Sequence, residues 1–390
     1  MFINFKICIP KPNMIFASYN NIISPLGFTT EQNYRAVLNS EIAVKPTQLH
    51  FSNDAFCVGK INDELLEQHA VSIEKAHQHT RLEKLSILSI QDVLQQSGIQ
   101  PQDDKLLVVY STTKGNIDIL ENAYPNIDSK RVYLHQLTQH LQNHFQFKHQ
   151  PVVLSNACIS GILAIIMAQR WIQSGQFNHV IVCGGDILSE FTISGFKSFN
   201  ALSTEPCKPF DANRTGINLG EAVSSILLTN QELLSSPYHT AIVAGASAND
   251  ANHISGPSRN GDGLYQCLQT ILQNQSLDGC GFISAHGTAT PFNDEMESIA
   301  FDRSALNTIP VNSLKGYYGH TLGAAGVLET VLSLESLKHQ TLIKSQGFDN
   351  IGVSGKISVI PQHTPATFSS FIKTASGFGG CNAAALFKKI

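Results

Sequence analysis

One of the eight cysteines, Cys158, stands where a strand is expected to end and a helix to begin. The apolar run 152–154 predicts a short buried strand, and the spacing of apolar residues from Ile162 onward predicts a helix. A thiol at such a junction faces unpaired amides and the positive end of the helix dipole, an environment that favours the nucleophilic thiolate. The alternative for a lone cysteine is an inert thiol, packed as a small apolar side chain.

A histidine, His286, follows the expected strand 281–285 and opens a loop of small hydroxyl residues. A neutral imidazole at this place can donate or accept one hydrogen bond near neutral pH. Thr288 and Thr290 in the same loop offer hydroxyls that could hold an amide-bearing ligand arm. Taken alone, His286 could equally be an ordinary loop histidine.

A second histidine, His320, precedes the strongly apolar segment 322–338, which is expected to be helical. The run Gly323-Ala-Ala-Gly326 lowers the helix propensity, and a helix tolerates this cost where something packs very closely against its backbone. We therefore expect a central, buried helix. At its N-terminus the dipole would disfavour an imidazolium and keep His320 a neutral hydrogen-bond donor.

Charged residues accompany both histidines. Asp294 and Glu297 stand near the start of the helix expected after the first histidine, where favourable interaction with the helix dipole could also explain them. Lys315, five residues before the second histidine, is either an electrostatic organiser or a surface lysine. Glu329 falls within the apolar helix, so it needs a partner such as Lys315 or a backbone amide.

A cysteine nucleophile, two neutral histidines and a lysine together indicate one kind of chemistry. Cysteine proteases use one histidine, with an Asn or Asp that orients it. A second histidine that donates a hydrogen bond suits a reaction in which negative charge develops on a thioester oxygen as an enolate forms.

The composition bounds the rest of the molecule. The chain has 390 residues, 42% of them hydrophobic, which is enough for two domains or one duplicated domain with a large core. Only 14% are charged and the net charge is -4, so we expect extensive burial, a subunit interface and no nucleic-acid partner. The eight cysteines are scattered without a CxxC pair, which predicts no metal site and no disulfide framework, but reduced thiols in the cytoplasm.

The first 13 residues contain apolar side chains that Lys6 and Pro10 interrupt. This segment is too short and broken for a signal peptide, and we expect a short extension before the first strand. No apolar run in the chain is long enough to span a membrane.

Strands and helices are expected to alternate along the chain, which indicates an α/β fold. Residues 40–62 are expected to be irregular and 196–220 to form a long loop. Both halves contain a strand that leads into a chemically active segment and a helix, which hints at an internal duplication. The expected strands are 15–24, 106–110, 152–154, 179–183, 221–229, 241–244, 281–285, 309–312, 368–375 and 383–388, and the expected helices are 31–38, 64–97, 134–145, the segment from 162, 263–274, 296–306 and 322–338.

Four segments, taken in order, resemble the motif set of the β-ketoacyl-acyl carrier protein synthases of the Cys-His-His type. They are Asn156-Ala-Cys-Ile-Ser-Gly161, His286-Gly-Thr-Ala-Thr-Pro291, Lys315-Gly-Tyr-Tyr-Gly-His320 followed by Gly323-Ala-Ala-Gly-Val-Leu-Glu329, and Gly377-Phe-Gly-Gly-Cys-Asn382. The resemblance runs from about Met14 to the C-terminus. It implies a thiolase-like fold of two similar halves, 14–235 and 236–390, in five αβαβα layers, usually as a homodimer.

The resemblance also implies a decarboxylative Claisen condensation that extends a fatty-acid, polyene or polyketide chain. Cys158 would accept the acyl chain from an acyl carrier protein, and His286 and His320 would support decarboxylation of the malonyl group and stabilise the enolate. Lys315 and Glu329 would order the site. The enzyme would bind no cofactor of its own, because the carrier protein brings the phosphopantetheine.

Further roles follow from the same resemblance. The amides of Cys158 and Phe378 would form an oxyanion hole, and Phe378 would also gate access to the sulfur. Thr288 and Thr290 would hold the phosphopantetheine arm. Lys208 falls where the family places a basic contact to the carrier protein.

The chain departs from the family pattern at Asn156, Ile159 and Cys381, where the family usually has Thr, a smaller residue and Thr. The loop 112–117, Thr-Thr-Lys-Gly-Asn-Ile, replaces a Gly-rich segment that helps to shape the acyl pocket, and it resembles synthases of aryl-polyene or flexirubin-type pigment clusters. If Lys114 points into the pocket, aryl or polyenoyl primers would fit better than saturated acyl chains. Otherwise Lys114 is a solvated side chain.

Two other functions stay open. One is a non-catalytic, chain-length-type partner subunit of a ketosynthase heterodimer, although such partners usually lack the nucleophile that Cys158 supplies. The other is a thiolase, whose second catalytic cysteine could be Cys381. A homodimer and a heterodimer are both compatible with the sequence.

Overall fold

The two halves of the chain build sheets with the same strand order. The computed structural model describes residues 14–121, 124, 126–233, 236–250 and 256–390, so the predicted N-terminal extension lies outside the described residues. The N-terminal strands stand in the order β5-β4-β6-β8-β1 and the C-terminal strands in the order β11-β10-β15-β16-β9, which in both halves is third, second, fourth, fifth, first along the chain. The strands are β1 (Phe16–Ile23), β4 (Leu106–Ser111), β5 (Val152–Leu154), β6 (His179–Asp186), β8 (Ala222–Thr229), β9 (Thr240–Asn249), β10 (Cys280–Ser284), β11 (Pro310–Asn312), β15 (Ser370–Gly377) and β16 (Cys381–Lys389).

A short antiparallel pairing joins the two sheets. Phe16 and Ala17 of β1 pair with Ala241 and Thr240 of β9, and β13 (Ser358–Val359) is added at the C-terminal edge. The repeated strand order agrees with the duplication inferred from the sequence. The halves divide between β8 and β9, while the boundary at 235/236 stays a prediction.

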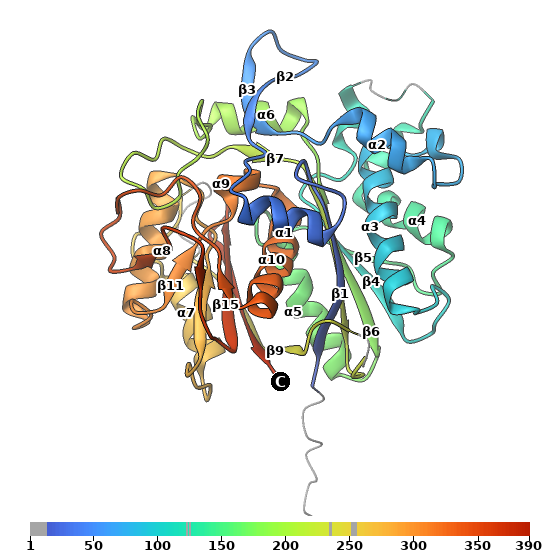
Figure 1. Ribbon diagram of the computed structural model, residues 1–390. Helices are drawn as coiled ribbons and strands as arrows, with labels where there is room; N and C mark the ends of the chain where they lie inside the picture. The colour runs from blue at the N-terminus through green and yellow to red at the C-terminus, as the bar shows by residue number, and fades with distance from the viewer. Residues whose placement is uncertain (1–13, 122–123, 125, 234–235, 251–255) are drawn as a thin grey trace, which may run out of the picture.

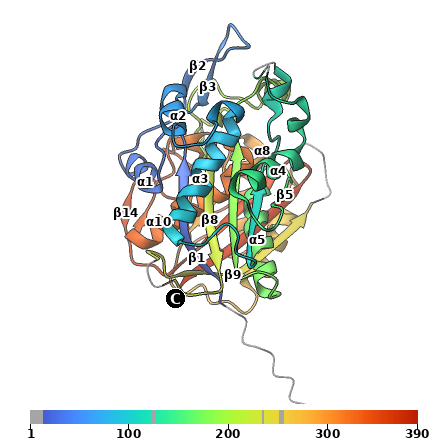
Figure 2. The ribbon, with the colours of Figure 1, turned by 90° about the vertical axis from the view of Figure 1, so that its right-hand side faces the viewer.

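Helices form three layers around these sheets (Figure 1). Two helices pack against each other between the sheets, two cover the outer face of the N-terminal sheet, and two cover the outer face of the C-terminal sheet. In that order they are α5 (Ser160–Gln173) and α10 (Ala325–His339), α3 (Arg81–Ser97) and α4 (Leu134–Phe145), and α7 (Asp262–Leu272) and α8 (Pro291–Arg303). Figure 2 shows α3 and α4 from the outer side. This is the predicted five-layer arrangement of the thiolase-like fold.

The strand β4, which lies between helix layers, is buried along its whole length. All six residues of β4, Leu-Leu-Val-Val-Tyr-Ser, are buried, as expected for a parallel strand covered on both faces. Separate apolar clusters fill the space between the sheets and the space under each outer helix layer. The middle cluster, which includes Ile162 and Val331, therefore joins the two halves.

Residues 40–62 are not irregular as expected. β2 (Lys45–Gln48) and β3 (Ala55–Gly59) form an antiparallel hairpin, which β7 (Leu219–Gly220) extends to a small separate sheet. All residues of β2 are at least partly exposed, so no apolar alternation marks this strand in the sequence.

Two longer predictions also need correction. The helix expected over 64–97 is interrupted, because α2 (Asp63–Ala70) ends early and a capping box of Thr80 and Glu83 starts α3. The loop expected over 196–220 begins inside α6 (Glu190–Ser198), whose first turn the Ser189 side chain caps.

The other short elements complete the description. They are α1 (Thr30–Leu38), α9 (Lys315–Tyr318), β12 (Thr341–Leu342) and β14 (Thr364–Pro365), with 3-10 turns at Ala76–Gln78, Ile117–Glu121, Ser129–Val132 and Leu322–Ala324. Within the described ranges, every helix is too short or too polar to cross a bilayer.

Candidate active site

Cys158 stands at a sharp turn between β5 and α5. Ala157 before it has a positive φ of 44°, and the Ser160 hydroxyl donates to the Ala157 carbonyl while it accepts from the Asn156 amide. A positive φ at a non-glycine residue is strained, and such strain is concentrated at functional sites. The turn places the thiol just before the first residue of α5, as the sequence predicts.

The crossing of α5 and α10 brings the second half of the molecule to this turn. Gly161 and Gly326 face each other so closely that a Cβ on Gly161 would lie 2.9 Å from the Gly326 Cα. All residues of α10 from Ala325 to Leu337 are buried. The prediction of a central helix with another backbone packed against its glycines is therefore confirmed.

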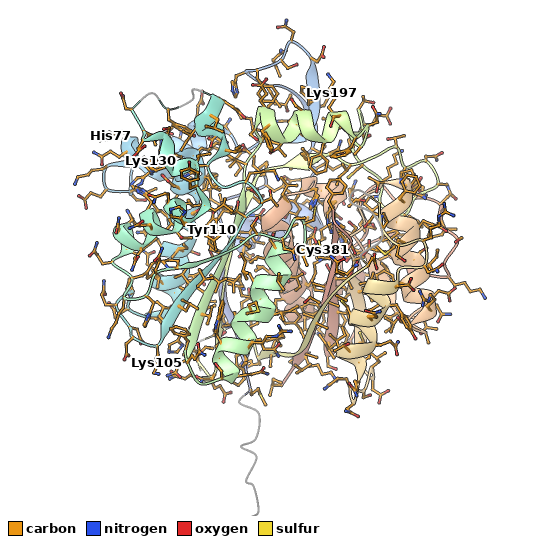
Figure 3. The ribbon with its side chains drawn as sticks, turned by 180° about the vertical axis from the view of Figure 1, so that it is seen from behind. His77, Lys105, Tyr110, Lys130, Lys197 and Cys381 are labelled. Carbon is orange, nitrogen blue, oxygen red and sulfur yellow. The ribbon has the colours of Figure 1, made fainter. Side chains whose placement is uncertain are left out.

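A pocket of about 380 Å³ opens over the sulfur and is lined by both halves. Cys158, His286 and His320 all line it, and the sulfur and one ring nitrogen of each histidine lie within 4.8 Å of one another. The centroids of the two imidazoles are 5.1 Å apart, and the rings are nearly perpendicular, at 84°. Figure 3 labels Cys381 near the middle of the molecule, and its two neighbours in the chain, Gly380 and Asn382, line the pocket.

The backbone fixes the tautomer of His320. The Leu322 amide donates to Nδ1 of His320 at 3.3 Å, so the proton of the neutral ring must sit on Nε2. This Nε2 is buried without a hydrogen-bond partner in the described chain, and so is Nδ1 of His286. Buried polar atoms without a partner are costly, and these two are available to a bound substrate.

Both histidines are neutral, as expected. Burial lowers the pKa of each imidazole well below the usual 6.5, and the positive charges of Lys315 and Lys373 lower it further. A neutral imidazole can donate one hydrogen bond and accept another, so each ring can either take up a proton or stabilise an oxyanion.

Cys158 itself departs from the prediction. Burial raises the pKa of its thiol to about 12, and this outweighs the opposite effects of Lys315, Lys114 and the Phe378 amide. Because the side chain is only 7% exposed, loss of hydration prevails over the helix dipole. The resting residue is therefore a thiol, and its attack needs a base, which a neutral histidine can supply.

Asp294 and Glu297 hold the loop of His286 and do more than cap a helix. Glu297 accepts the amides of His286 at 2.8 Å and Gly287 at 2.6 Å, and Asp294 accepts the amide of Thr288 at 2.8 Å. Both carboxylates are fully buried, and burial raises the pKa of each. They fix the backbone that carries the first histidine.

Lys315 and Glu329 form the ion pair that the sequence predicts. Lys315 Nζ lies 2.7 Å from Oε1 of Glu329 and 2.5 Å from the carbonyl oxygen of His286. A second buried lysine, Lys373 of β15, lies 2.6 Å from Oε2 of the same carboxylate. Lys373 was not predicted, although a charged residue in the middle of a predicted strand is a signal that could have identified it.

Three phenylalanines surround the mouth of the pocket. The ring of Phe378 is partly exposed and lies 5.7 Å from that of Phe196 and 5.4 Å from that of Phe199. Phe196 belongs to α6, the helix that was expected to be loop. The backbone of Phe378 lowers the pKa of the Cys158 thiol, so this backbone group acts on the reacting atom.

Of the remaining predicted residues, two line the pocket and two lie outside it. Thr288 and Thr290 line the pocket, with their hydroxyl oxygens 2.8 Å apart. Lys114 is half-buried and does not line this pocket, yet its charge lowers the pKa of Cys158. Lys208 is also half-buried outside the pocket, with its side chain beside Gly347.

A second residue that was not predicted, Asp186, lies behind the pocket. Its carboxylate accepts hydrogen bonds from the Thr112 hydroxyl at 2.8 Å, the Thr113 amide at 2.9 Å and the Gly323 amide at 2.7 Å. It thus ties the loop after β4 to the turn after His320. The signal was a carboxylate at the carboxyl end of a buried strand, where α/β folds tend to place ligands.

Cys381 does not line the pocket. Its thiol donates to the Phe378 carbonyl at 3.3 Å, and burial raises its pKa to about 11. This geometry gives no support to the thiolase alternative, which needs a second cysteine at the reacting atoms.

Comparison with known proteins identifies the family. Residues 22–233 match the family model described as β-ketoacyl synthase, N-terminal domain, and residues 240–349 match its C-terminal domain. A putative mitochondrial 3-oxoacyl-[acyl-carrier-protein] synthase of Schizosaccharomyces pombe is 29% identical over 72% of this chain and 74% of its own length. The 3-oxoacyl-[acyl-carrier-protein] synthase 2 of Vibrio cholerae is 24% identical over 95% of this chain and 97% of its own length.

Solved structures share the fold at lower identity. The ketosynthase ApeO in complex with its chain length factor ApeC, from Xenorhabdus doucetiae, matches with a TM-score of 0.84 and 24% identity, over 97% of this chain and 98% of that chain. The ishigamide ketosynthase/chain length factor matches with a TM-score of 0.86 and 19% identity, over 97% and 99%. The family matches cover both halves of the pocket, so the chain belongs to the β-ketoacyl synthase family and is an acyltransferase of the ketosynthase class.

Proposed function

We propose that the chain condenses malonyl-acyl carrier protein, with loss of CO₂, with an acyl group held as a thioester on Cys158. The observation that carries this proposal is the convergence of one sulfur and two neutral imidazoles within 4.8 Å in a single pocket. The imidazoles come from the half of the chain that lacks the nucleophile, so the site is complete only when the halves are packed together.

The first half-reaction would load Cys158. Because burial raises the pKa of its thiol to about 12, the proton must leave as the sulfur attacks the thioester carbon, and a neutral histidine accepts it. The amides of Cys158 and Phe378 stabilise the tetrahedral oxyanion. The carrier thiol then leaves with the proton, and the acyl group remains on the sulfur.

The second half-reaction would extend the chain. The bond between the malonyl carbon and its carboxylate breaks, CO₂ leaves, and the electron pair forms an enolate. The enolate oxygen accepts one hydrogen bond from the Nε2–H of His320 and another from His286. The enolate carbon attacks the acyl carbonyl, a carbon–carbon bond forms, the bond to Cys158 breaks, and the thiolate takes up a proton from solvent.

The carrier protein would deliver both substrates on its phosphopantetheine arm. The arm enters past Phe378, Thr288 and Thr290 hold its amides, and Lys208 contacts the carrier surface. The lining of the pocket by both threonines supports this path. The enzyme would bind no cofactor of its own.

The assembly would be a dimer with a second ketosynthase-type subunit, which is either a copy of this chain or a chain length factor. The edge position of β5, with Val152, Val153 and Leu154 only half-buried, supports such an interface. The molecular mass of the purified chain in solution distinguishes the two, because a homodimer forms without any other protein.

Mass spectrometry of the intact protein after incubation with acyl carrier protein thioesters tests the central proposal. We expect an acyl adduct on the wild-type chain and none on Cys158→Ala. Cys381→Ala, which changes a thiol outside the pocket, is the matched control and should still be acylated. A wild-type chain without an adduct would exclude the catalytic function and leave the non-catalytic partner subunit.

We propose further that the enzyme prefers aryl or polyenoyl primers, as in synthesis of an aryl-polyene or flexirubin-type pigment. The charge of Lys114 acts on Cys158, and Asp186 holds the Lys114 amide at 3.3 Å, so a polar, ordered loop replaces a glycine-rich one. Lys114 does not line the pocket, but a saturated chain long enough to reach it from Cys158 would desolvate the charge without compensation. Cinnamoyl-carrier protein should acylate Cys158 at least several-fold faster than octanoyl-carrier protein, and Lys114→Met should reduce the difference. Comparable rates for both primers in the wild type would contradict this preference.

A further inference from the structure

Lys373 is a buried cation that the proposed reaction does not touch. It is 0% exposed, and its Nζ lies among four oxygens. These are Oε2 of Glu329 at 2.6 Å and the carbonyl oxygens of Thr374 at 2.7 Å, Ser284 at 3.1 Å and Ala285 at 3.3 Å. All four are acceptors, and only the ammonium form offers three donors to them.

Two of these carbonyls end the strand that leads directly to His286. The next carbonyl, that of His286 itself, is bound by Lys315 at 2.5 Å, and the His286 amide is bound by Glu297 at 2.8 Å. Successive peptide groups next to the imidazole are therefore each held by a buried charged side chain. Lys373 holds the two carbonyls before the histidine, and no other charged side chain in the described part of the chain donates to them.

Buried charges of both signs surround His286. Lys315 and Lys373 contact opposite oxygens of Glu329, and Glu297 accepts the hydroxyl of Thr374, the residue after Lys373, at 3.2 Å. Asp294 adds a third buried carboxylate to the same loop. Removing one member of such a buried cluster leaves a partner uncompensated, which is far more costly than removing a surface charge.

We propose that Lys373 is a positioning residue for His286: it holds the end of β10 and balances Glu329, so that the imidazole faces the enolate oxygen. The proposal rests on the role of His286 in decarboxylation proposed above. Since Lys373 touches neither the sulfur nor the substrate, its loss should slow decarboxylation and largely spare acylation of Cys158.

Lys373→Met, which keeps the length of the side chain and removes its charge, tests this difference. We expect decarboxylation of malonyl-carrier protein to fall by about tenfold or more, because a misplacement of about 1 Å can cost a hundredfold in rate. Acylation of Cys158 should stay within about threefold of the wild-type rate. Lys389→Met, on the exposed end of the neighbouring strand β16, is the matched control and should change neither rate. Equal losses in both half-reactions of Lys373→Met would overturn the proposal.

The pH profile gives a readout that a purely structural role would not move. The charge of Lys373 lowers the pKa of both histidines, so its removal lets these pKa values rise. The imidazoles then take up a proton at a higher pH, and the acid limb of the decarboxylation profile of Lys373→Met should shift to higher pH. Lys373→Arg, which retains the positive charge, should show the wild-type limb. An unshifted limb in Lys373→Met would count against the proposal.

Chemical rescue separates the charge from the side chain. Lys373→Ala leaves space for a small cation, and methylammonium should restore decarboxylation by about fivefold or more because it supplies both the charge and N–H donors. Tetramethylammonium carries the same charge without donors and should not rescue. Equal effects of the two cations, or no effect of either, would overturn the proposal.

A double variant covers the case in which the uncompensated Glu329 prevents folding. Lys373→Met combined with Glu329→Gln removes both charges, and its decarboxylation should be about tenfold slower than that of Glu329→Gln alone. Equal rates would overturn the positioning role of Lys373. Failure of the proposed function is distinguishable, because then the wild-type chain itself would form no acyl adduct on Cys158.

Discussion

The two halves of the molecule have the same strand order but carry different chemistry at corresponding positions. In each half the third strand leads to the central helix, and the connecting segment carries Cys158 after β5 and His320 after β11. The second strand leads to a loop that carries Lys114 after β4 and His286 after β10. One half thus provides the nucleophile and the other provides both imidazoles.

The halves also differ in the buried charges that lie next to the pocket residues. Asp186 of the N-terminal half is satisfied by hydroxyl and amide donors alone, among them Thr112 and the amide of Gly323. The C-terminal half instead places two buried lysines among the carboxylates of Glu329, Glu297 and Asp294 around His286. A duplicated scaffold can therefore keep its geometry while one copy supplies a thiol and the other supplies the electrostatic environment.

The largest expected effect separates the two half-reactions. His286→Ala and His320→Ala each remove one imidazole from the developing enolate, and loss of one such donor costs about a hundredfold to a thousandfold in rate. We expect this loss in the release of CO₂ from malonyl-carrier protein, whereas intact-mass measurements should still detect acylation of Cys158. His135→Ala, on the exposed face of α4, is the control. If acylation is lost first, the division of labour between the halves is wrong.

Alkylation by iodoacetamide tests the state of the N-terminal nucleophile. Only the thiolate reacts, and its fraction rises about tenfold per pH unit below the pKa. With a thiol pKa of about 12, the rate at Cys158 should keep rising from pH 7 to pH 10, by about a thousandfold in all. The mass of the alkylated protein, with Cys158→Ala to correct for other cysteines, measures this rate. An alkylation rate that stops rising near pH 7 would mean that the helix dipole lowers the pKa of the thiol more than burial raises it.

The residues that react could be identified from the sequence because their chemistry restricts their type. Cys158, His286 and His320 stand in sequence motifs whose other positions also have characteristic residue types. The pairing of Lys315 with Glu329 could be predicted because a carboxylate inside an apolar helix needs a partner. The raised pKa of the thiol could not be foreseen in the same way. It depends on how completely the other half covers the sulfur, and local sequence does not contain that information.

The supporting residues could not be identified, because their partners are distant in the chain. Asp186 acquires its role only when the fold brings it to Gly323, and Lys373 only when β15 places it against Glu329. The prediction of local structure over residues 40–62 was wrong for a related reason. The exposed strand β2 has no apolar alternation, so it depends on pairing with β3.

Asp186 is a residue of the N-terminal half that bonds to the turn after His320. Its Oδ2 accepts the Gly323 amide at 2.7 Å, one residue after the Leu322 amide that fixes the His320 tautomer. Asp186→Asn should slow decarboxylation by about tenfold and lower the melting temperature, because an amide cannot satisfy all the donors and an unpaired buried group costs about 1–3 kcal/mol. Thermal unfolding followed by circular dichroism and CO₂ release measure both effects. Asp278→Asn at an exposed site is the control. A wild-type rate of decarboxylation in Asp186→Asn would show that Asp186 does not position His320.

The smallest effect is expected where α5 and α10 cross. A methyl group on Gly161 would lie 2.9 Å from the Gly326 Cα and from the Val327 amide nitrogen, so the two helices must separate. Overpacking of this kind costs about 1–3 kcal/mol, and each kcal/mol lowers the melting temperature of a chain of 390 residues by about 1 °C. Gly195→Ala is the matched control, since nothing lies within 4 Å of a Cβ there and the exchange should stabilise α6 by up to about 1 kcal/mol. Because Gly161 follows the nucleophile closely in the chain and its partner helix follows the second histidine, Gly161→Ala should slow acylation and decarboxylation together. Loss of one half-reaction alone would show that this contact does not hold the two halves in register.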